Sequence, residues 1–159
     1  MISTRYILER TQTIPYPPER VFPFFAEVRN LEHITPKFLH FQIITPMPIG
    51  VHVGTLIEYR IKIFGIPIHW RTRIDELDRP KRFVDRQVTG PYDEWVHLHE
   101  FQRVPAGTQI RDVVRYRMPM GFLGIIAHRL FVSRMLGRIF DYRRSAISEN
   151  FSRGSTCEG

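Results

Sequence analysis

Apolar and polar residues alternate with a period of two over most of residues 1–118, which is the pattern of β-strands that bury one face. The alternation predicts strands over residues 3–14, 38–45, 55–64, 66–77, 82–88, 94–104 and 108–118. Residues that favour turns separate them, at positions 46–50, 65, 78–80, 90–91 and 105–107. These short separations predict hairpins and therefore an antiparallel sheet.

Helical patterns occur in two places. After the first strand, Pro18 is placed to open a short helix that has Phe22 and Phe25 on one side. Asn30 can cap a second short helix, which runs to residue 34 and ends before Pro36. From residue 121 to residue 151 the apolar residues recur at helical spacing, which predicts one long C-terminal helix.

The order of these elements predicts an α+β fold. An antiparallel sheet of six or seven strands must bury one face, and the closing helix is the only element large enough to cover it. We therefore expect a curved antiparallel sheet wrapped around a long C-terminal helix, with two short helices after the first strand. A space between this sheet and the helix is the default place for a ligand.

The chain has 159 residues, which fits one domain with a sizeable core. We assign the domain to residues 1–151 and expect residues 152–159 to form a disordered tail. The single cysteine, Cys157, excludes an intramolecular disulfide and any multi-cysteine metal site. No apolar run has the length of a membrane span, and the first ten residues lack the apolar segment of a signal peptide. We expect a cytoplasmic protein without integral membrane association, while the oligomeric state stays open.

The net charge of +7 permits binding to nucleic acid or to anionic lipid without requiring either. The arginines are scattered, and most alternate with apolar residues, as on the solvated face of a strand. No run of four basic residues occurs, and no helix-turn-helix, zinc-finger or RNA-recognition signature is present. We therefore expect no nucleic-acid partner.

Several segments resemble those of a known family. They are RNLEHITP (29–36), GIPIHW (65–70), FVDRQVTGPY (83–92), WVHLHEF (95–101) and FDYR (140–143). The chain resembles the bacterial ligand-binding SRPBCC proteins of the START-like helix-grip superfamily, often called polyketide cyclase/dehydrase-like, roughly over residues 3–151. The resemblance implies the helix-grip fold. Members of that superfamily carry lipids, bind hormones, cyclise polyketides or hydroxylate rings, so the resemblance does not choose a function. The Cys and His ligands of Rieske-type relatives are absent, which excludes an iron–sulfur oxygenase.

Polar side chains recur on the strand face that we expect to point inward. In residues 94–104 the odd positions carry Trp95, His97 and His99, and alternation places them on one face. The same rule turns further polar and aromatic residues inward on the other strands, namely Tyr59, Trp70, Asp85, Gln87, Asp112 and Tyr116. The hairpin loop at 104–107 puts His99 opposite Asp112, and a matching register in the preceding hairpin puts Asp85 opposite His97. Buried polar groups need such partners.

The C-terminal helix contributes one inward charge. Its apolar stripe, spaced at 100° per residue, consists of Ile125, Val132, Leu136, Ile139, Phe140 and Ile147. Arg143 falls at the centre of this stripe, and Arg129 also falls on it. A buried guanidinium needs an anionic partner, so we expect Arg143 to reach Asp85, Asp112 or an anionic group of a ligand.

The His-x-His pair has two further interpretations. His97, His99 and Asp112 together have the donor types of a two-His-one-carboxylate metal site. A fourth ligand and a known metal motif are both missing, which favours hydrogen-bonded imidazoles, and we expect no metal and no cofactor. Alternatively, His97 or His99 could act with Asp85 or Asp112 as general acid and base. This would make the protein a cofactor-independent cyclase or dehydratase, a lyase or isomerase. No serine elbow, P-loop or dinucleotide fingerprint occurs.

The interpretation that we prefer is binding of a small hydrophobic ligand, lipid-like or polycyclic, in the cavity between sheet and helix. Its expected contacts are Tyr59, Trp70, Gln87, Trp95, His97, His99, Tyr116 and Arg143. A structural domain with a filled core is the alternative, and an open cavity would separate the two. Residues 122–127 beside Arg129 could touch the edge of a bilayer, but ordinary packing at the start of the helix is the favoured expectation.

Overall fold

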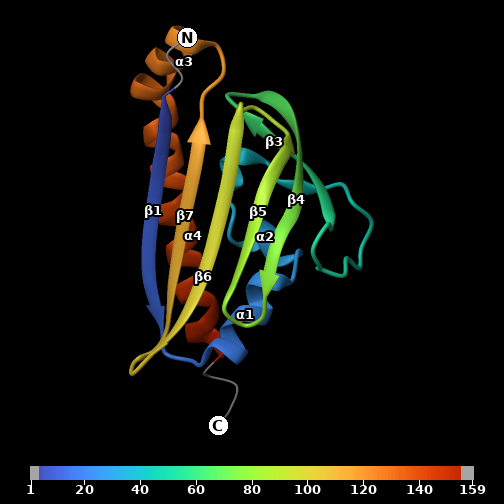
Figure 1. Cartoon of the computed structure of the whole chain (residues 1–159), viewed down its shortest axis with the longest axis vertical. Helices are drawn as coiled ribbons and strands as arrows, with labels where there is room; N and C mark the ends of the chain where they lie inside the picture. Colours follow the sequence, from blue (N-terminus) through green and yellow to red (C-terminus); the bar gives the residue numbers. More distant parts are fainter. Residues whose placement is uncertain (1–3, 155–159) are drawn as a thin grey trace.

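The computed structural model describes residues 4–154 (Figure 1). Within this range the strands are β1 (Arg5–Ile14), β2 (Gln42–Ile43), β3 (Leu56–Ile63), β4 (Ile66–Asp78), β5 (Arg82–Thr89), β6 (Glu94–Val104) and β7 (Gly107–Arg117). The helices are α1 (Pro18–Ala26), α2 (Asn30–His33), the 3-10 helix η1 (Lys37–Leu39), α3 (Gly121–Ala127), the π-helical segment η2 (His128–Val132) and α4 (Ser133–Gly154).

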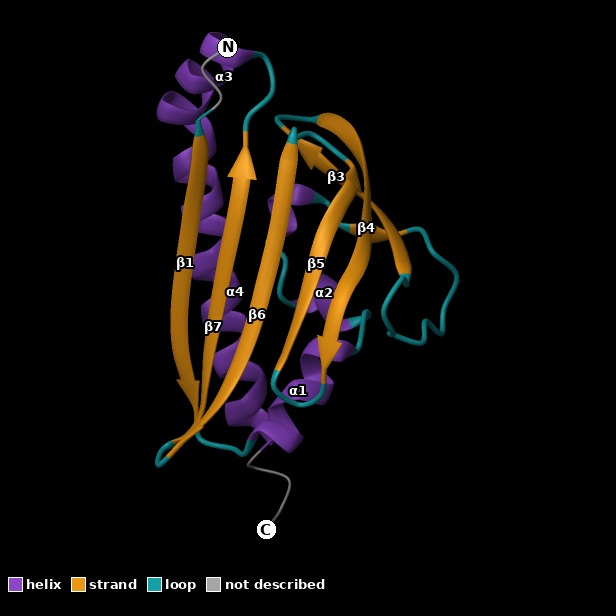
Figure 2. Cartoon of the chain, viewed as in Figure 1, coloured by secondary structure: helices purple, strands orange, loops and turns teal. Residues whose placement is uncertain are grey.

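The strands form one antiparallel sheet in the order β1-β7-β6-β5-β4-β3-β2. Figure 2 shows this sheet curving in front of α4, with α1 and α2 on the same side of the sheet as α4. The chain runs from β1 at one edge to β2 at the other edge and then returns strand by strand to β7. The predicted α+β arrangement is confirmed, including the two short helices after the first strand.

The register of the central hairpins is the predicted one. Asp85 lies opposite His97 between β5 and β6, and His99 lies opposite Asp112 between β6 and β7. Along β6 the odd residues from 95 to 101 are buried, whereas the even residues are partly exposed. The alternation of large aromatic and imidazole side chains therefore fixes which face of the sheet turns toward α4.

The strand predicted over residues 38–45 is wrong in most of its length. Only Gln42 and Ile43 pair with β3, and η1 precedes them. His40 ends η1 with φ 46°, a left-handed conformation that no strand adopts. Leu39 of η1 is buried and packs in the apolar cluster that contains Trp70 and Phe140.

The C-terminal helix covers the inner face of the sheet. Its residues Leu136, Phe140 and Ile147 are buried, as the apolar stripe predicts. Helix α4 continues to Gly154, three residues beyond the predicted end of the domain at residue 151. The rest of the predicted tail, including Cys157, lies outside the described residues. Within residues 4–154 no helix is both long enough and apolar enough to cross a membrane.

The π-helical segment η2 changes which residues share a helix face. A π turn contains one residue more than an α turn, so η2 rotates the preceding residues relative to α4. Arg129, which a regular helix would place on the apolar stripe, is therefore exposed. The packing expected at the start of the helix is also wrong, since Phe122, Leu123 and Ile126 are exposed.

The core consists of two main apolar clusters with a polar layer between them. One cluster joins α1 to the end of α4 through Phe22, Phe101 and Phe151. The other joins β4 and β6 to the middle of α4 through Trp70, Trp95, Phe140 and their neighbours. Along β6, the two histidines lie between Trp95 of the second cluster and Phe101 of the first. The sheet thus carries its polar inner residues in the middle of an apolar interior.

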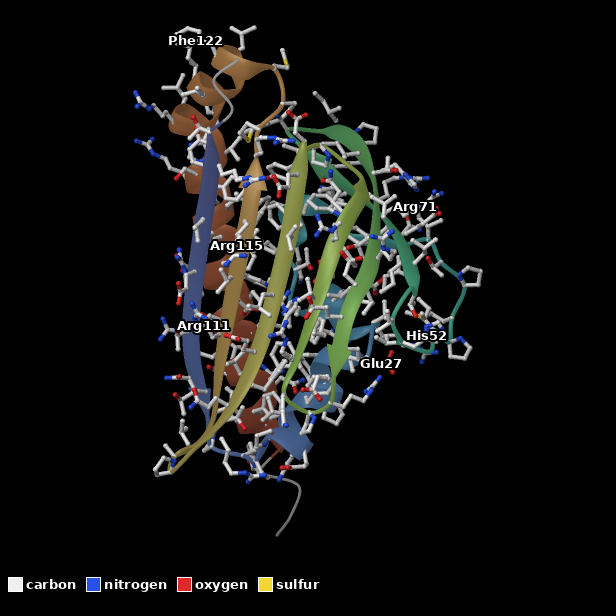
Figure 3. All side chains as sticks on the ribbon, viewed as in Figure 1. Glu27, His52, Arg71, Arg111, Arg115 and Phe122 are labelled. Atoms are coloured by element: carbon white, nitrogen blue, oxygen red, sulfur yellow. The ribbon has the colours of Figure 1, made fainter. Side chains whose placement is uncertain are left out.

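The outer face of the sheet carries many arginines, and several of them form ion pairs across strands. Arg111 lies between Glu9, at 2.6 Å, and Glu100, at 2.8 Å (Figure 3). Arg71 of β4 similarly pairs with Glu58 of β3 at 2.6 Å. These are exposed pairs, which individually contribute roughly 0–1 kcal/mol.

Candidate ligand-binding cavity

A cavity of about 180 Å³ lies between the inner face of the sheet, α4 and the α1–α2 segment. Its wall on the sheet side is aromatic. Trp70 stacks on Tyr59 with ring centroids 5.7 Å apart and meets Trp95 edge to face at 5.3 Å. Burial raises the pKa of Tyr59, so this wall carries no charge at neutral pH. The cavity therefore offers a flat aromatic surface to an apolar ligand.

A cluster of two imidazoles and two carboxylates adjoins the cavity on its sheet side, and three of its members, Asp85, His97 and His99, line the cavity. His97 Nε2 lies 2.9 Å from Asp112 Oδ1, and His99 Nε2 lies 2.8 Å from Asp85 Oδ2. These hydrogen bonds are diagonal to the strand register, which places His99 opposite Asp112 and His97 opposite Asp85. The opposite pairs approach as well: His99 Nδ1 is 2.9 Å from Asp112 Oδ1, although not in hydrogen-bond alignment, and His97 Nδ1 is 3.9 Å from Asp85 Oδ2. The four side chains form a closed ring of alternating acid and imidazole.

The two histidines differ in protonation. Burial and the adjacent charge of His99 lower the pKa of His97 to about 4. Burial also acts to lower the pKa of His99, but the carboxylates of Asp112 and Asp85 outweigh it, and the net direction is upward. The imidazole rings lie only 3.7 Å apart, so protonation of one disfavours protonation of the other. His97 is therefore neutral at neutral pH, and His99 is the imidazole of the pair that binds a proton more readily.

Arg143 projects from α4 into the same cavity, as predicted from its place on the apolar stripe. The expected direct ion pair is wrong, because no carboxylate of residues 4–154 lies within 4.0 Å of its guanidinium. Instead, the guanidinium carbon lies 5.8 Å from the centre of the Phe25 ring. Burial acts to raise the pKa of Asp112, but the charge of Arg143, the hydrogen bond from His97 and the nearby imidazole of His99 hold it well below its usual range. Two carboxylates thus lie near Arg143 and the more readily protonated imidazole, His99.

Three buried side-chain nitrogens of cavity-lining residues lack a hydrogen-bond partner within residues 4–154, namely Trp70 Nε1, His99 Nδ1 and Arg143 Nε. His99 Nδ1 already lies 2.9 Å from Asp112 Oδ1, and the other two are donors in the wall of the cavity. A buried donor without a partner costs about 1–3 kcal/mol, and a ligand oxygen that accepts a hydrogen bond would recover that cost. The two donors indicate that the cavity suits a ligand with acceptor groups, in addition to an apolar body.

The donor set for a metal is Asp85, His97 and His99, whose ligand atoms lie within 4.8 Å of one another. This set differs from the predicted one, in which Asp112 was the carboxylate. The imidazole Nε2 atoms already bond to carboxylates, and the positive charge of Arg143 acts on both carboxylates. A divalent cation would have to compete with these hydrogen bonds and with the positive charge of Arg143. The residues fit hydrogen bonding better than metal coordination, and the absence of a cofactor stays a prediction.

Most residues predicted as ligand contacts line the cavity, namely Tyr59, Trp70, Trp95, His97, His99 and Arg143. Tyr116 and Gln87 do not. The Tyr116 hydroxyl instead bonds to His128 Nε2 at 2.8 Å, behind Trp95. The Gln87 side-chain amide donates to the carbonyl oxygen of Tyr92 at 2.7 Å, which fixes the β5–β6 turn. Of the candidate acid–base residues, Asp85 lines the cavity, whereas Asp112 contacts it only through the two imidazoles.

The sequence did not indicate the wall opposite the sheet. Phe25, Leu31 and Ile34 of the α1–α2 segment line the cavity, and so does Tyr92 from the β5–β6 turn. The place of Phe25 on the apolar side of the first short helix was the available signal. Tyr92 lies in a turn, where the period-two rule gives no face, and its burial depends on contacts with Trp70 and Trp95.

The sequence profile of one family, described as polyketide cyclase / dehydrase and lipid transport, matches residues 14–138 of the chain. The match extends over most of the chain, and the protein therefore belongs to this family, whose helix-grip fold provides a site for hydrophobic ligands. The predicted resemblance is confirmed. Comparison with curated proteins gives no sequence match.

Solved structures share the fold at low sequence identity. The Zhui aromatase/cyclase from Streptomyces sp. R1128 is similar with a TM-score of 0.72 and 19% identity, covering 94% of this chain and 95% of that one. TTHA0849 from Thermus thermophilus gives 0.69 and 18%, covering 96% and 99%. SA2116 from Staphylococcus aureus, of unknown function, gives 0.70 and 13%, covering 97% and 98%. At these identities the likeness concerns the fold alone.

Proposed function

We propose that the protein binds a small hydrophobic ligand, lipid-like or polycyclic, that carries a hydrogen-bond acceptor such as a carbonyl or hydroxyl oxygen. The observation that carries the proposal is the pair of unpartnered buried donors, Trp70 Nε1 and Arg143 Nε, in a cavity of residues 4–154 that is otherwise largely apolar. The apolar body would lie against Tyr59, Trp70 and Trp95. The acceptor oxygen would lie near Arg143, beside the cluster of histidines and carboxylates.

The charge balance of the site decides between neutral and anionic ligands. Asp85 and Asp112 offset Arg143 and His99 even when His99 is protonated, so a ligand carboxylate would leave the buried site with at least one excess negative charge. An uncompensated buried charge is costly. A neutral acceptor takes the hydrogen bond of Arg143 without this cost. We therefore expect a ketone, quinone or phenol to bind more tightly than the matching acid.

Titration with an apolar fluorophore tests the proposal. Saturable binding is expected, and a hydrophobic ketone should displace the fluorophore more effectively than the carboxylic acid of the same skeleton. Trp95→Ala should weaken binding of both competitors, whereas Arg143→Met should selectively weaken the ketone. Arg144→Met, at an exposed position of the same helix, is the matched control. Failure of a panel of apolar probes to bind would favour a structural domain instead.

A second function is proposed because the pKa values of the two histidines shift in opposite directions. In a dehydration, neutral His97 would take the proton from the carbon next to a ligand carbonyl. Protonated His99 would donate a proton to the departing hydroxyl group, which leaves as water. A base is most effective when its pKa is near the working pH, and the pKa of His97, about 4, makes it a weak one. We therefore rank ligand binding without catalysis ahead of dehydration.

The two functions differ in what His97→Gln changes. In a β-hydroxy ketone dehydration assay, a catalytic His97 predicts that kcat falls while ligand affinity stays within about a factor of two. A carrier predicts that no dehydration is detected in either protein.

A further inference from the structure

The end of the molecule at α3 and η2 exposes apolar side chains on a helical surface. Phe122 is 74% exposed and projects outward at the tip of the molecule (Figure 3). Further exposed apolar residues of this segment are Met120, Leu123, Ile126, Leu130 and Phe131. An exposed helix face is normally polar, and a contiguous apolar patch of this kind marks an interaction site. We call this set, together with Phe64 and Ile66 of the β3–β4 hairpin, which are also exposed, the apolar tip.

The β3–β4 hairpin adds a second apolar element at the same end (Figure 1). Its turn residue Phe64 is 78% exposed and adopts φ 50°, next to Gly65 at φ 77°. A two-residue hairpin turn of this type favours Asn-Gly, since a bulky side chain at positive φ is strained. The rings of Phe64 and Phe131 meet edge to face at 6.2 Å, which joins the hairpin to the helix. The backbone of Phe64 is strained and its side chain is mostly exposed, so burial in the core does not explain a Phe at this turn position. This combination points to a role outside the fold.

The apolar tip is held in place by specific contacts. A Cβ atom at Gly124 would lie 2.0 Å from the carbonyl oxygen of Pro119, so only glycine lets α3 approach the preceding turn this closely. His128 stacks on Tyr6 at 3.6 Å and bonds to the Tyr116 hydroxyl. These contacts anchor one side of the helix to β1 and β7. The exposed residues on its other side are therefore a fixed surface of the folded protein.

The charge around the apolar tip is positive. Residues 118–140 contain three arginines and no acidic residue. Arg129 and Arg134 are exposed and form no ion pair within residues 4–154, unlike most arginines of the sheet. Lys62 lies two residues before Phe64. An apolar surface with unpaired cations around it is complementary to a bilayer that contains anionic lipids.

The apolar tip also adjoins the cavity. Ile63, next to Phe64, and Met135, one helical turn after Phe131, both line the cavity. A molecule that leaves a bilayer at the Phe64–Phe131 contact would therefore meet cavity residues directly. We infer that the apolar tip docks the protein reversibly on the surface of an anionic lipid bilayer, with Phe122, Phe131 and Phe64 inserted among the lipids and Arg129 and Arg134 at the headgroups.

Sedimentation with vesicles tests the inference. Vesicles of phosphatidylcholine with phosphatidylglycerol should bind the protein more tightly than vesicles of phosphatidylcholine alone, and added salt should reduce the difference. Phe122→Ser should lower the partition coefficient about tenfold, since insertion of the ring would be lost. Val53→Ser, also at an exposed apolar position but on the loop before β3, is the matched control and should leave partition unchanged.

A further variant tests whether vesicle binding requires the arginines around the apolar tip. The double substitution Arg129→Gln and Arg134→Gln should lower partition roughly thirtyfold, because each arginine near an anionic surface contributes about 1 kcal/mol. Arg144→Gln is the control. It is exposed on the same helix, roughly 20 Å from Arg129 along the axis. All of these positions are exposed, so thermal unfolding should not change.

Three outcomes would overturn the inference. The first is that the protein binds neither type of vesicle, and the second is that Phe122→Ser and Val53→Ser lower vesicle binding equally. The third is that the protein binds no vesicles but forms dimers in ultracentrifugation, and that the substitution Phe122→Ser dissociates these dimers. The last would assign the surface to a second copy of the chain. The proposal of membrane docking and the proposal of cavity binding can be refuted independently, because Trp95→Ala tests fluorophore binding and Phe122→Ser tests vesicle binding.

Discussion

Stability should fall as the pH is lowered from 7 to 5, and His97 should cause much of that fall. Its pKa lies near 4 in the folded protein, compared with an ordinary value of 6.5. As the pH falls below 6.5, the unfolded chain binds a proton at His97 while the folded protein does not. Protons therefore favour unfolding. One pKa unit corresponds to about 1.4 kcal/mol, so the cost between pH 7 and pH 5 is about 2 kcal/mol.

The titratable groups near His97 change the stability in other directions or at other pH values. The raised pKa of His99 gives a contribution that is complete below pH 6.5 and is lost as the pH rises through its folded pKa. The lowered pKa values of Asp85 and Asp112 give contributions that are present above about pH 4 and are lost as the pH falls through their folded values. His128, whose pKa is also lowered by burial, acts in the same direction as His97.

A variant isolates the contribution of His97. Urea unfolding at pH 5, 6 and 7, followed by the fluorescence of the two buried tryptophans, gives the free energy of unfolding. His97→Gln should be less stable than the parent at pH 7, through its weakened bond to Asp112, but should lose about 2 kcal/mol less on acidification. His99→Gln should instead remove pH dependence above 6.5. Parallel curves for His97→Gln and the parent would refute the buried neutral imidazole.

Three other measurements test the site and the fold. Asp112→Asn should lower the free energy of unfolding in urea by about 3–5 kcal/mol, because it leaves the buried charge of Arg143 without this carboxylate. Adding Arg143→Met should restore at least about 0.5 kcal/mol. Strictly additive effects of the two substitutions would mean that the two charges do not interact. Gly107→Ala should cost at least about 1–3 kcal/mol in the same assay, because φ is +130° and the new Cβ atom would lie 2.2 Å from a backbone oxygen of β1, whereas Gly50→Ala, with open space around it, should cost far less. Elemental analysis of the purified protein should find no stoichiometric transition metal, and chelators should leave its thermal midpoint unchanged; one bound metal per chain would revive the His-x-His site.

The fold was predictable because period and turn chemistry agree along most of the chain. Alternation in β6 and the short loop after Val104 were enough to place His99 opposite Asp112. The hydrogen bonds themselves were not predictable, because the choice between opposite and diagonal partners depends on side-chain rotamers. The prediction of a direct ion pair for Arg143 was wrong for a similar reason. The helix face that carries Arg143 was predicted correctly, but the distance from α4 to the sheet is set by the packing of Phe140 and its neighbours.

The helix start was the least predictable region. A regular spacing of 100° per residue placed Arg129 on the buried stripe, and only the π-helical segment at 128–132 turns it outward. The sequence alone gives no marker for such a segment. The apolar character of residues 122–127 is evident from the sequence, but hydrophobicity without a partner surface in view favours burial as the default expectation.

The sheet order has a consequence for synthesis on the ribosome. The first strand made, β1, pairs only with the last, β7, and Arg5 lies opposite Arg117. At typical elongation rates of about 5–20 residues per second, β1 waits roughly 6–22 s for its partner, while β2 to β7 can form consecutive hairpins as they emerge. The covering helix α4 follows later still. A nascent or truncated chain that stops before residue 117 therefore presents an unpaired strand edge together with an uncovered apolar face, the combination from which aggregation begins.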